Sequence, residues 1–152
     1  MKRRTLGNTG APVSILGIGD IADRSVPLEK CAATIQRAMD YGLNPVDTAP
    51  GYESGYSEQI VGAALKGRRE GMFVIDKIDD LAGPVRPQVE ASLRALSLET
   101  VDLFVFHAVS KMADWGRIAA AGMTEPAKCQ AAGKVRFRGI SAIIPQCCAP
   151  RS

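Results

Sequence analysis

The sequence contains few aromatic residues, a single histidine and no pattern of cysteines suited to a metal ion. Aromatic residues make up 5% of the 152 residues, and His107 is the only histidine. The four cysteines lack a Cys-x-x-Cys spacing and lie far from His107 in the sequence. We therefore expect no metal site. The formal net charge is only +3 and the basic residues are scattered, which argues against a surface for nucleic acid.

Long apolar runs are also absent from the sequence. No run approaches the roughly eighteen apolar residues that a membrane span needs. Residues 1–4 are positively charged, but polar residues and glycines follow where a signal peptide requires an apolar stretch. We therefore expect a cytoplasmic protein that does not contact a membrane.

The length and composition are those of one globular domain. With 152 residues, of which 46% are hydrophobic, the chain is long enough for one core and too short for two. We expect this domain to cover residues 1–142. Residues 143–152 show no helical period and include Cys147 and Cys148, so they are predicted to form an irregular tail.

Short apolar runs recur roughly every thirty residues, and helical patterns lie between them. The predicted strands cover residues 15–19, 45–47, 73–75, 103–106 and 135–140. Helices are expected over residues 27–41, 57–65, 86–96 and 125–132, the second and the fourth capped by Ser57 and Thr124. Residues 111–122 are predicted to form a loop with one short helical turn. A β-hairpin of residues 3–6 and 12–14 precedes the repeats.

Strands that alternate with helices imply a parallel sheet with right-handed crossovers. Two architectures fit this pattern, an open doubly wound sheet and an arc of a (β/α)8 barrel. In both of them the reacting groups gather at the carboxyl ends of the strands. The order of the elements alone leaves the choice between the two open.

Ionisable side chains occur where these strands are predicted to end. Asp47, Lys77 and His107 close three of the strands, and Tyr52 follows Asp47 in the next loop. Taken singly, each has an ordinary explanation: the aspartate as a helix cap, the lysine as a local ion-pair partner, the histidine as a satisfied core residue. Together they are hard to explain by packing, because such groups are rarely buried without partners.

These four side chains are suited to the reduction of a carbonyl group. The reaction needs a hydride on carbon and a proton on oxygen, and a phenol with an ordinary pKa of about 10 releases its proton reluctantly. An ammonium group at Lys77 would stabilise the phenolate of Tyr52, and Asp47 would hold that ammonium group by ion pairing. His107 can form a hydrogen bond with the carbonyl oxygen. The four residues therefore predict a reductase site.

The sequence around these residues resembles that of the aldo/keto reductases. The resemblance rests on Arg4-Thr-Leu-Gly-Asn-Thr-Gly10, Leu16-Gly-Ile-Gly19, Asp47-Thr-Ala-Pro-Gly-Tyr52, Phe73-Val-Ile-Asp-Lys77, Val101-Asp-Leu-Phe-Val-Phe-His107 and Gly133-Lys-Val-Arg-Phe-Arg-Gly-Ile-Ser141. It covers residues 3–142 and is closest to a bacterial branch whose longer members often carry an iron–sulfur segment. Cys147 and Cys148 lack the spacing of that segment, so no cluster is expected.

The resemblance implies an α/β fold, an incomplete (β/α)8 TIM-type barrel of about five βα strands behind the N-terminal hairpin. It implies NAD(P)H-dependent reduction of a small aldehyde or ketone, with Tyr52 as proton donor. Lys77 and Asp47 would help Tyr52 to release its proton, and His107 would orient the substrate. Positions near a cofactor, NADPH or NADH, are matched by Gly19, Asp20, Asp47 and Ser141.

The chain departs from the family pattern at three positions. Asp20 stands where many relatives have a small or hydroxyl residue, Asp76 stands where threonine is common, and Ala142 replaces a frequent asparagine or glycine. A carboxylate at position 20 or 76 would repel cofactor phosphates or compete for Lys77 unless it faces away from the site.

The length is the largest departure from the family pattern. A full barrel has eight strands and about 250 residues, whereas five strands are predicted here, and the last residues resemble the out-of-frame tail of an interrupted gene. We therefore expect a truncated reductase that is inactive unless its open sheet edges are completed by self-association or by a partner. The alternatives are a non-catalytic interaction protein that uses those edges and a gene remnant without a selected function.

Overall fold

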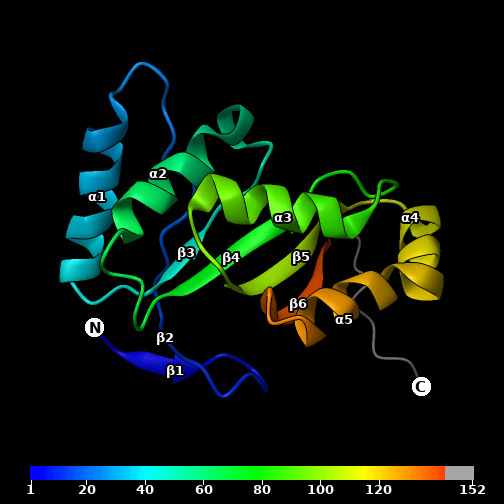
Figure 1. Ribbon diagram of the computed structural model, residues 1–152. Coiled ribbons are helices and arrows are strands. Elements are labelled where there is room, and N and C mark those ends of the chain that lie inside the picture. The colour runs from blue at the N-terminus through cyan, green and yellow to red at the C-terminus, as the bar shows by residue number, and fades with distance from the viewer. Residues whose placement is uncertain (143–152) are drawn as a thin grey trace.

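A four-stranded parallel sheet with helices along one face forms the body of the protein, and a β-hairpin lies at its amino-terminal end (Figure 1). The computed structural model describes residues 1–142. The strands are β1 (Arg3–Thr5), β2 (Pro12–Ser14), β3 (Pro45–Asp47), β4 (Phe73–Ile78), β5 (Val101–Val109) and β6 (Val135–Ala142). The helices are α1 (Leu28–Asp40), α2 (Tyr56–Leu65), α3 (Val85–Leu96), α4 (Met112–Arg117) and α5 (Thr124–Ala131). The predicted tail with Cys147 and Cys148 lies outside the described residues.

The strand order distinguishes between the two predicted architectures. Strands β3, β4, β5 and β6 pair in sequence order, and every pair is parallel. Helices α1, α2, α3 and α5 follow one another along a single face of the sheet (Figure 1). A doubly wound sheet would reverse its strand order and carry helices on both faces. The described part of the chain is therefore an arc of a (β/α) barrel.

The first predicted strand is reduced to a single bridge. Residues 15–19 contribute only the parallel bridge between Ile18 and Val46, and Ile15 and Leu16 are exposed. The hydroxyl of Ser14 donates a hydrogen bond to the Leu16 carbonyl at 2.6 Å. This bond turns the chain directly after β2 and leaves little room for a regular strand. The sheet of the described residues thus has four strands and one flanking bridge.

The helices begin and end close to their predicted positions, but the two predicted caps are wrong. Helix α2 begins at Tyr56, and the Ser57 hydroxyl accepts a hydrogen bond from the Thr48 hydroxyl at 2.8 Å instead of capping the helix. Thr124 lies inside α5, which has no side-chain cap. The predicted loop at residues 111–122 forms α4 and a turn of π-helix, Ile118–Gly122. Gly42, at φ +88°, lies just beyond α1, where glycine adopts this conformation without strain.

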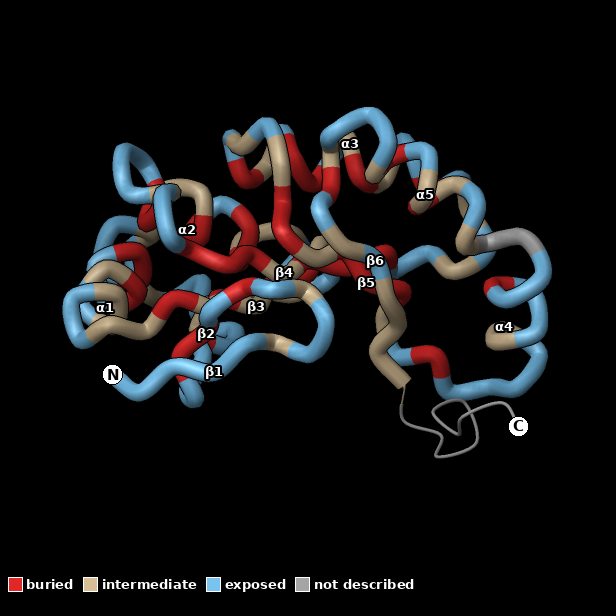
Figure 2. Tube along the Cα trace, turned by 90° about the horizontal axis from the view of Figure 1, so that it is seen from below, coloured by how far each residue is buried: buried red, intermediate tan, exposed pale blue. Residues whose placement is uncertain are grey.

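Alternate residues of β4 face opposite sides of the sheet. Val74 and Ile78 belong to the main core beneath the helices, whereas Phe73 packs with Val13 of the hairpin in a smaller cluster on the other face. Figure 2 shows the buried segments running along the strands and the helix sides that cover them, while the hairpin is largely exposed. Because side chains alternate along a strand, Asp76 faces the helices and Lys77 faces the inside of the arc.

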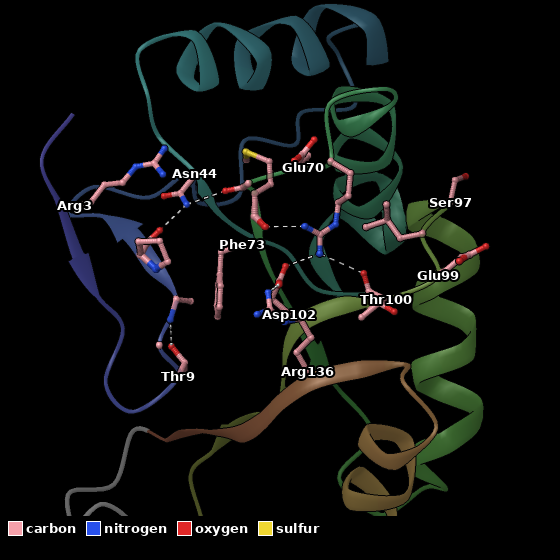
Figure 3. Close-up of a pocket in the computed structure, with 17 residues that line it drawn as sticks. Arg3, Thr9, Asn44, Glu70, Phe73, Ser97, Glu99, Thr100, Asp102 and Arg136 are labelled. Atoms are coloured by element: carbon pink, nitrogen blue, oxygen red, sulfur yellow. Dashed lines mark hydrogen bonds and ion pairs between the residues drawn. The ribbon is translucent and has the colours of Figure 1, made fainter.

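The amino-terminal end of the sheet is closed by polar side chains that are fully paired. The Asn44 amide donates to the carbonyls of Pro12 and Gly71, both at 3.0 Å, and accepts from the Ser14 amide at 2.8 Å. The Asp102 carboxylate is 1% exposed and accepts from Arg69, Arg136 and the Val74 amide. A cavity of about 800 Å³ lies among these residues (Figure 3). It is at the opposite end of the sheet from Lys77 and His107.

Candidate active site

The four predicted catalytic residues meet at the carboxyl end of the sheet. Asp47 is the last residue of β3, and Lys77 is the last but one of β4. His107 lies near the end of β5, and Tyr52 begins a short 3-10 turn after β3, Tyr52–Gly55. The structure brings these side chains together, because parallel neighbouring strands end at the same edge.

Lys77 forms an ion pair at the centre of this cluster. Its Nζ donates to Asp47 Oδ2 at 2.6 Å and to the Thr48 carbonyl at 2.7 Å. The Lys77 side chain is 6% exposed and the Asp47 side chain 36% exposed. Nζ also lies 4.5 Å from the centre of the Tyr52 ring. The ammonium group is therefore held against the phenol by two oxygen acceptors, with Asp47 still open to solvent.

Tyr52 and His107 approach each other edge to face. Their ring centres are 5.5 Å apart with an interplanar angle of 79°, and the Tyr52 hydroxyl lies 3.5 Å from His107 Nε2. The register between β5 and β6 shifts directly after Phe106, and Ala108 has a φ of +49°. A β-bulge of this kind re-aims the neighbouring side chain. It sets the direction of the His107 ring at the end of the strand.

Sequence reasoning missed Asp79, which connects His107 to the loop of Tyr52. Asp79 Oδ1 lies 2.5 Å from His107 Nδ1, and Oδ2 accepts the Gly51 amide at 2.5 Å. A Cβ at position 51 would lie 2.7 Å from Asp79 Oδ2, so the close approach requires glycine. The signal in the sequence was a carboxylate two residues beyond Lys77, at the same strand end.

The turn that carries Tyr52 has a strained backbone. Glu53 and Ser54 have φ values of +46° and +52°, a region that non-glycine residues rarely occupy. The Arg24 guanidinium donates to both of their carbonyl groups. Such strain persists only where the surroundings fix it. Arg24 from the loop before α1 and Asp79 from the loop after β4 therefore fix the position of Tyr52.

The predicted cofactor residues lie on separate segments at the carboxyl end of the sheet. Gly19 lies beside Asp47, whose amide donates to the Ile18 carbonyl at 2.8 Å, and a Cβ built at Gly19 meets no atom within 4 Å. Asp20 Oδ1 accepts the Ala22 amide at 3.0 Å, so its carboxylate is turned toward its own chain. Ser141 is half-buried near the end of β6, at the opposite side of the four-stranded sheet from Asp47 on β3.

A family model for the aldo/keto reductase family matches residues 15–146. The chain belongs to this family. It is 32% identical to L-galactose dehydrogenase of Arabidopsis thaliana, over 92% of this chain and 48% of that protein. The holo form of the aldo-keto reductase AKR11C1 from Bacillus halodurans is 29% identical with a TM-score of 0.77, over 95% of this chain and 51% of its own.

A second solved relative carries a nucleotide. An aldo/keto reductase from Klebsiella pneumoniae in complex with NADP and acetate is 25% identical with a TM-score of 0.75, over 90% of this chain and 48% of its own. The chain thus spans about half the length of these aldo/keto reductases. The prediction of an incomplete TIM-type barrel is confirmed.

Residues 1–142 contain no group of three or more metal-ligating side chains that could hold a metal ion. None of the helices in this part is long and apolar enough to cross a membrane.

Proposed function

We propose that this chain supplies the catalytic end of an NAD(P)H-dependent aldo/keto reductase that reduces a small aldehyde or ketone to an alcohol. The observation that carries the proposal is the meeting of Asp47, Tyr52, Lys77 and His107 at one edge of the sheet. Membership of the aldo/keto reductase family supports it.

Tyr52 is the proton donor of the proposed reaction. Its phenol transfers a proton to the carbonyl oxygen as negative charge develops there. The Lys77 ammonium group, 4.5 Å from the ring centre, stabilises the phenolate that remains. Asp47 keeps the ammonium group in place by accepting its hydrogen bond. A neutral residue at position 77 would remove this stabilisation.

His107 orients the carbonyl oxygen, and Asp79 determines how it does so. A carboxylate can only accept a hydrogen bond, so His107 Nδ1 carries a hydrogen that it donates to Asp79. In the neutral ring Nε2 then accepts from the Tyr52 hydroxyl. In the imidazolium form Nε2 also donates, and it can then hold a carbonyl oxygen beside the phenol. Asp79 is the acceptor that fixes the orientation of the ring in both forms.

The nicotinamide end of the cofactor is proposed to lie beside Asp47. When bound, the nicotinamide supplies the hydride to the carbonyl carbon. Gly19 offers space because a Cβ there would meet no atom within 4 Å, and the half-buried Ser141 offers a hydroxyl to the carboxamide. We propose NADPH, since the Klebsiella pneumoniae relative was solved with NADP. Asp20 is turned to its own chain and does not oppose this placement.

We propose that self-association completes the barrel. Within the described residues, β6 pairs with β5 alone, and β3 has only the Ile18 bridge on its outer side. Unpaired edges of this kind readily add a further strand. Two copies would supply the eight strands of a closed barrel. We expect the activity to belong to this assembly and to rise with protein concentration.

The first experiment is a titration of the purified chain with NADPH, followed through Trp115 fluorescence at several protein concentrations. Light scattering on the same samples gives the mass of the assembly. We expect saturable binding and reduction of a model aldehyde in the associated form, and loss of turnover in Tyr52→Phe. Tyr41→Phe is the matched control, because Tyr41 is 63% exposed at the end of α1. Equal turnover in both variants, or full activity of a monomer, would overturn the proposal.

One observation favours a second candidate function, a non-catalytic interaction protein. The inner face of the arc carries Leu103 and Phe137, which are only partly buried, next to the open edge of β6. A partner that adds a strand to β6 would cover both side chains. A charge introduced by Phe137→Glu would then abolish partner binding, while Tyr52→Phe would leave binding unchanged.

A further inference from the structure

Three buried polar side chains face one another on the helix side of the sheet, away from the proposed active site. Asp76 of β4 is 0% exposed, Glu58 of α2 is 4% exposed and Ser92 of α3 is 1% exposed. Within the described residues, Asp76 Oδ2, Glu58 Oε1 and Ser92 Oγ have no hydrogen-bond partner. Buried oxygen atoms without partners are rare and costly. The cluster therefore needs a physical explanation.

Two ionised carboxylates at this position would be especially unfavourable. Both can only accept hydrogen bonds, so the contact between Asp76 and Glu58 becomes a hydrogen bond only when one of them carries a proton. The Lys77 ammonium group does not neutralise them, because it is bound to Asp47 on the other face. The arrangement resembles two carboxyl groups that share one proton.

The electrostatic environment agrees with this geometry. Burial raises the pKa of Asp76 well above its ordinary value, and the neighbouring Glu58 raises it further. Burial also raises the pKa of Glu58, against a lowering by Ser92 and by Asp76. Two further charged groups act on the pair: Lys77 lowers the pKa of Asp76, and Asp79 raises that of Glu58.

We propose that Glu58 and Asp76 hold one proton between them in the folded protein, and that this shared proton joins β4 to helices α2 and α3. The second oxygen of Asp76, Oδ1, accepts the Lys77 amide at 2.7 Å. The proton thus fixes the Asp76 side chain, which in turn accepts the hydrogen bond of the Lys77 backbone amide. The pair is not part of the proposed reductase site, so a chain without reductase activity would hold the same proton.

Folding then takes up a proton at neutral pH, because both carboxyl groups are ionised in the unfolded chain above about pH 4 to 5. Because the pKa is higher in the folded state than in the unfolded state, the protonated pair stabilises the fold fully at low pH. This contribution to the free energy of unfolding is lost as the pH rises toward the pKa of the folded state. One proton taken up changes the unfolding equilibrium constant about tenfold per pH unit. The protein is therefore expected to become less stable from about pH 5 upward.

The experiment compares urea unfolding of the wild type with Asp76→Asn and Glu58→Gln from pH 5 to pH 9. In each variant an amide N–H replaces the shared proton, and the asparagine of Asp76→Asn still offers an oxygen to the Lys77 amide. We expect the ratio of the unfolding equilibrium constant of the wild type to that of either variant to rise about tenfold per pH unit. The rise should stop at the pH where the folded pair loses its proton. Glu29→Gln, an exposed carboxylate in the first turn of α1, is the control and follows the wild type.

Parallel pH curves for the wild type and both variants would overturn the proposal. Infrared spectroscopy of the wild type gives an answer even if a variant does not fold. The C=O stretch of a protonated carboxyl group should be present at pH 7 and absent from the unfolded chain. Its absence from the folded wild type at pH 7 would also overturn the proposal, and its loss in Asp76→Asn would assign the proton to this pair.

Discussion

Polar side chains gather at both ends of the parallel sheet, but they are paired differently. At the amino-terminal end, Asp102 is 1% exposed and both of its oxygens accept hydrogen bonds from charged or backbone donors. At the carboxyl end, Asp47 pairs with the buried Lys77 and remains 36% exposed. In barrels of this type the carboxyl end carries the chemistry and the opposite end contributes stability. The comparison therefore predicts that substitutions at the two ends have separable effects.

The largest effect is expected from removing the charge at the carboxyl end. Lys77→Met should lower reductase turnover by about 10² to 10⁴, the usual contribution of a positioned acid or base. The free energy of unfolding should change by no more than about 1 to 2 kcal/mol, because the released Asp47 is partly solvated. Steady-state kinetics and urea unfolding measure the two quantities on the same sample. The separation of the two ends would be contradicted if the free energy of unfolding fell by as many kcal/mol as the activation free energy of turnover rose.

The amino-terminal end should show the reverse pattern. Asp102→Ala removes the carboxylate that accepts from Arg69, Arg136 and the buried Val74 amide. We expect a loss of about 3 kcal/mol, the lower end of the range for one partner of a buried ion pair, because both arginines are partly exposed. Asp40→Ala is the control, because Asp40 forms an exposed ion pair with Arg68 that contributes about 0 to 1 kcal/mol. Equal unfolding midpoints for the two variants would show that the Asp102 network does not stabilise the fold.

Asn44 offers a smaller test at the same end. Asn44→Ala removes three hydrogen bonds between the hairpin, the start of β3 and the loop before β4. A loss of about 1 to 3 kcal/mol is expected from buried groups left without partners. Hydrogen exchange should increase first in the amides of β1 and β2. Uniform exchange across the protein would mean that Asn44 does not hold the hairpin in place.

The smallest effect should come from Asp79→Asn at the carboxyl end. The asparagine keeps one acceptor oxygen for two donors, His107 Nδ1 and the Gly51 amide, so one of them loses its acceptor. We expect a decrease of roughly tenfold in turnover, about 1.4 kcal/mol, with the stability unchanged. Since the chain has one histidine, the single imidazole resonance reports the changed surroundings of the ring directly. An unchanged resonance together with unchanged kinetics would remove Asp79 from the site.

The four residues of the proposed site were predicted from the sequence pattern, and the barrel arc from the resemblance to the aldo/keto reductases. Short apolar runs and strand-end positions locate Asp47, Lys77 and His107 without any contact information, whereas the order of the elements also allowed an open doubly wound sheet. Asp79 could not be assigned a role, because its partners come from two other segments of the chain. The expected cap at Ser57 was wrong for the same reason, since Thr48 of another element engages its hydroxyl. Local rules predict elements, whereas side-chain partners depend on the packing between elements.

The carboxylate at position 76 shows this limit most clearly. The sequence left two outcomes, competition for Lys77 or a side chain that faces away. The structure places Asp76 among the helices, while Lys77 binds Asp47 on the inner face. What the sequence could not show is that Glu58 and Ser92 converge on the same point, because they lie on different helices, α2 and α3, that are brought together by tertiary packing.

The alternation of side chains along β4 gives two neighbouring residues separate hydrogen-bond partners. Lys77 and Asp76 are adjacent in the chain, yet their side chains point to opposite faces of the sheet. The separation does not extend to charge, because the Lys77 ammonium group lowers the pKa of Asp76 across the strand. A designer who changes the charge of the inner face toward a different substrate therefore has to expect a change in proton affinity on the outer face.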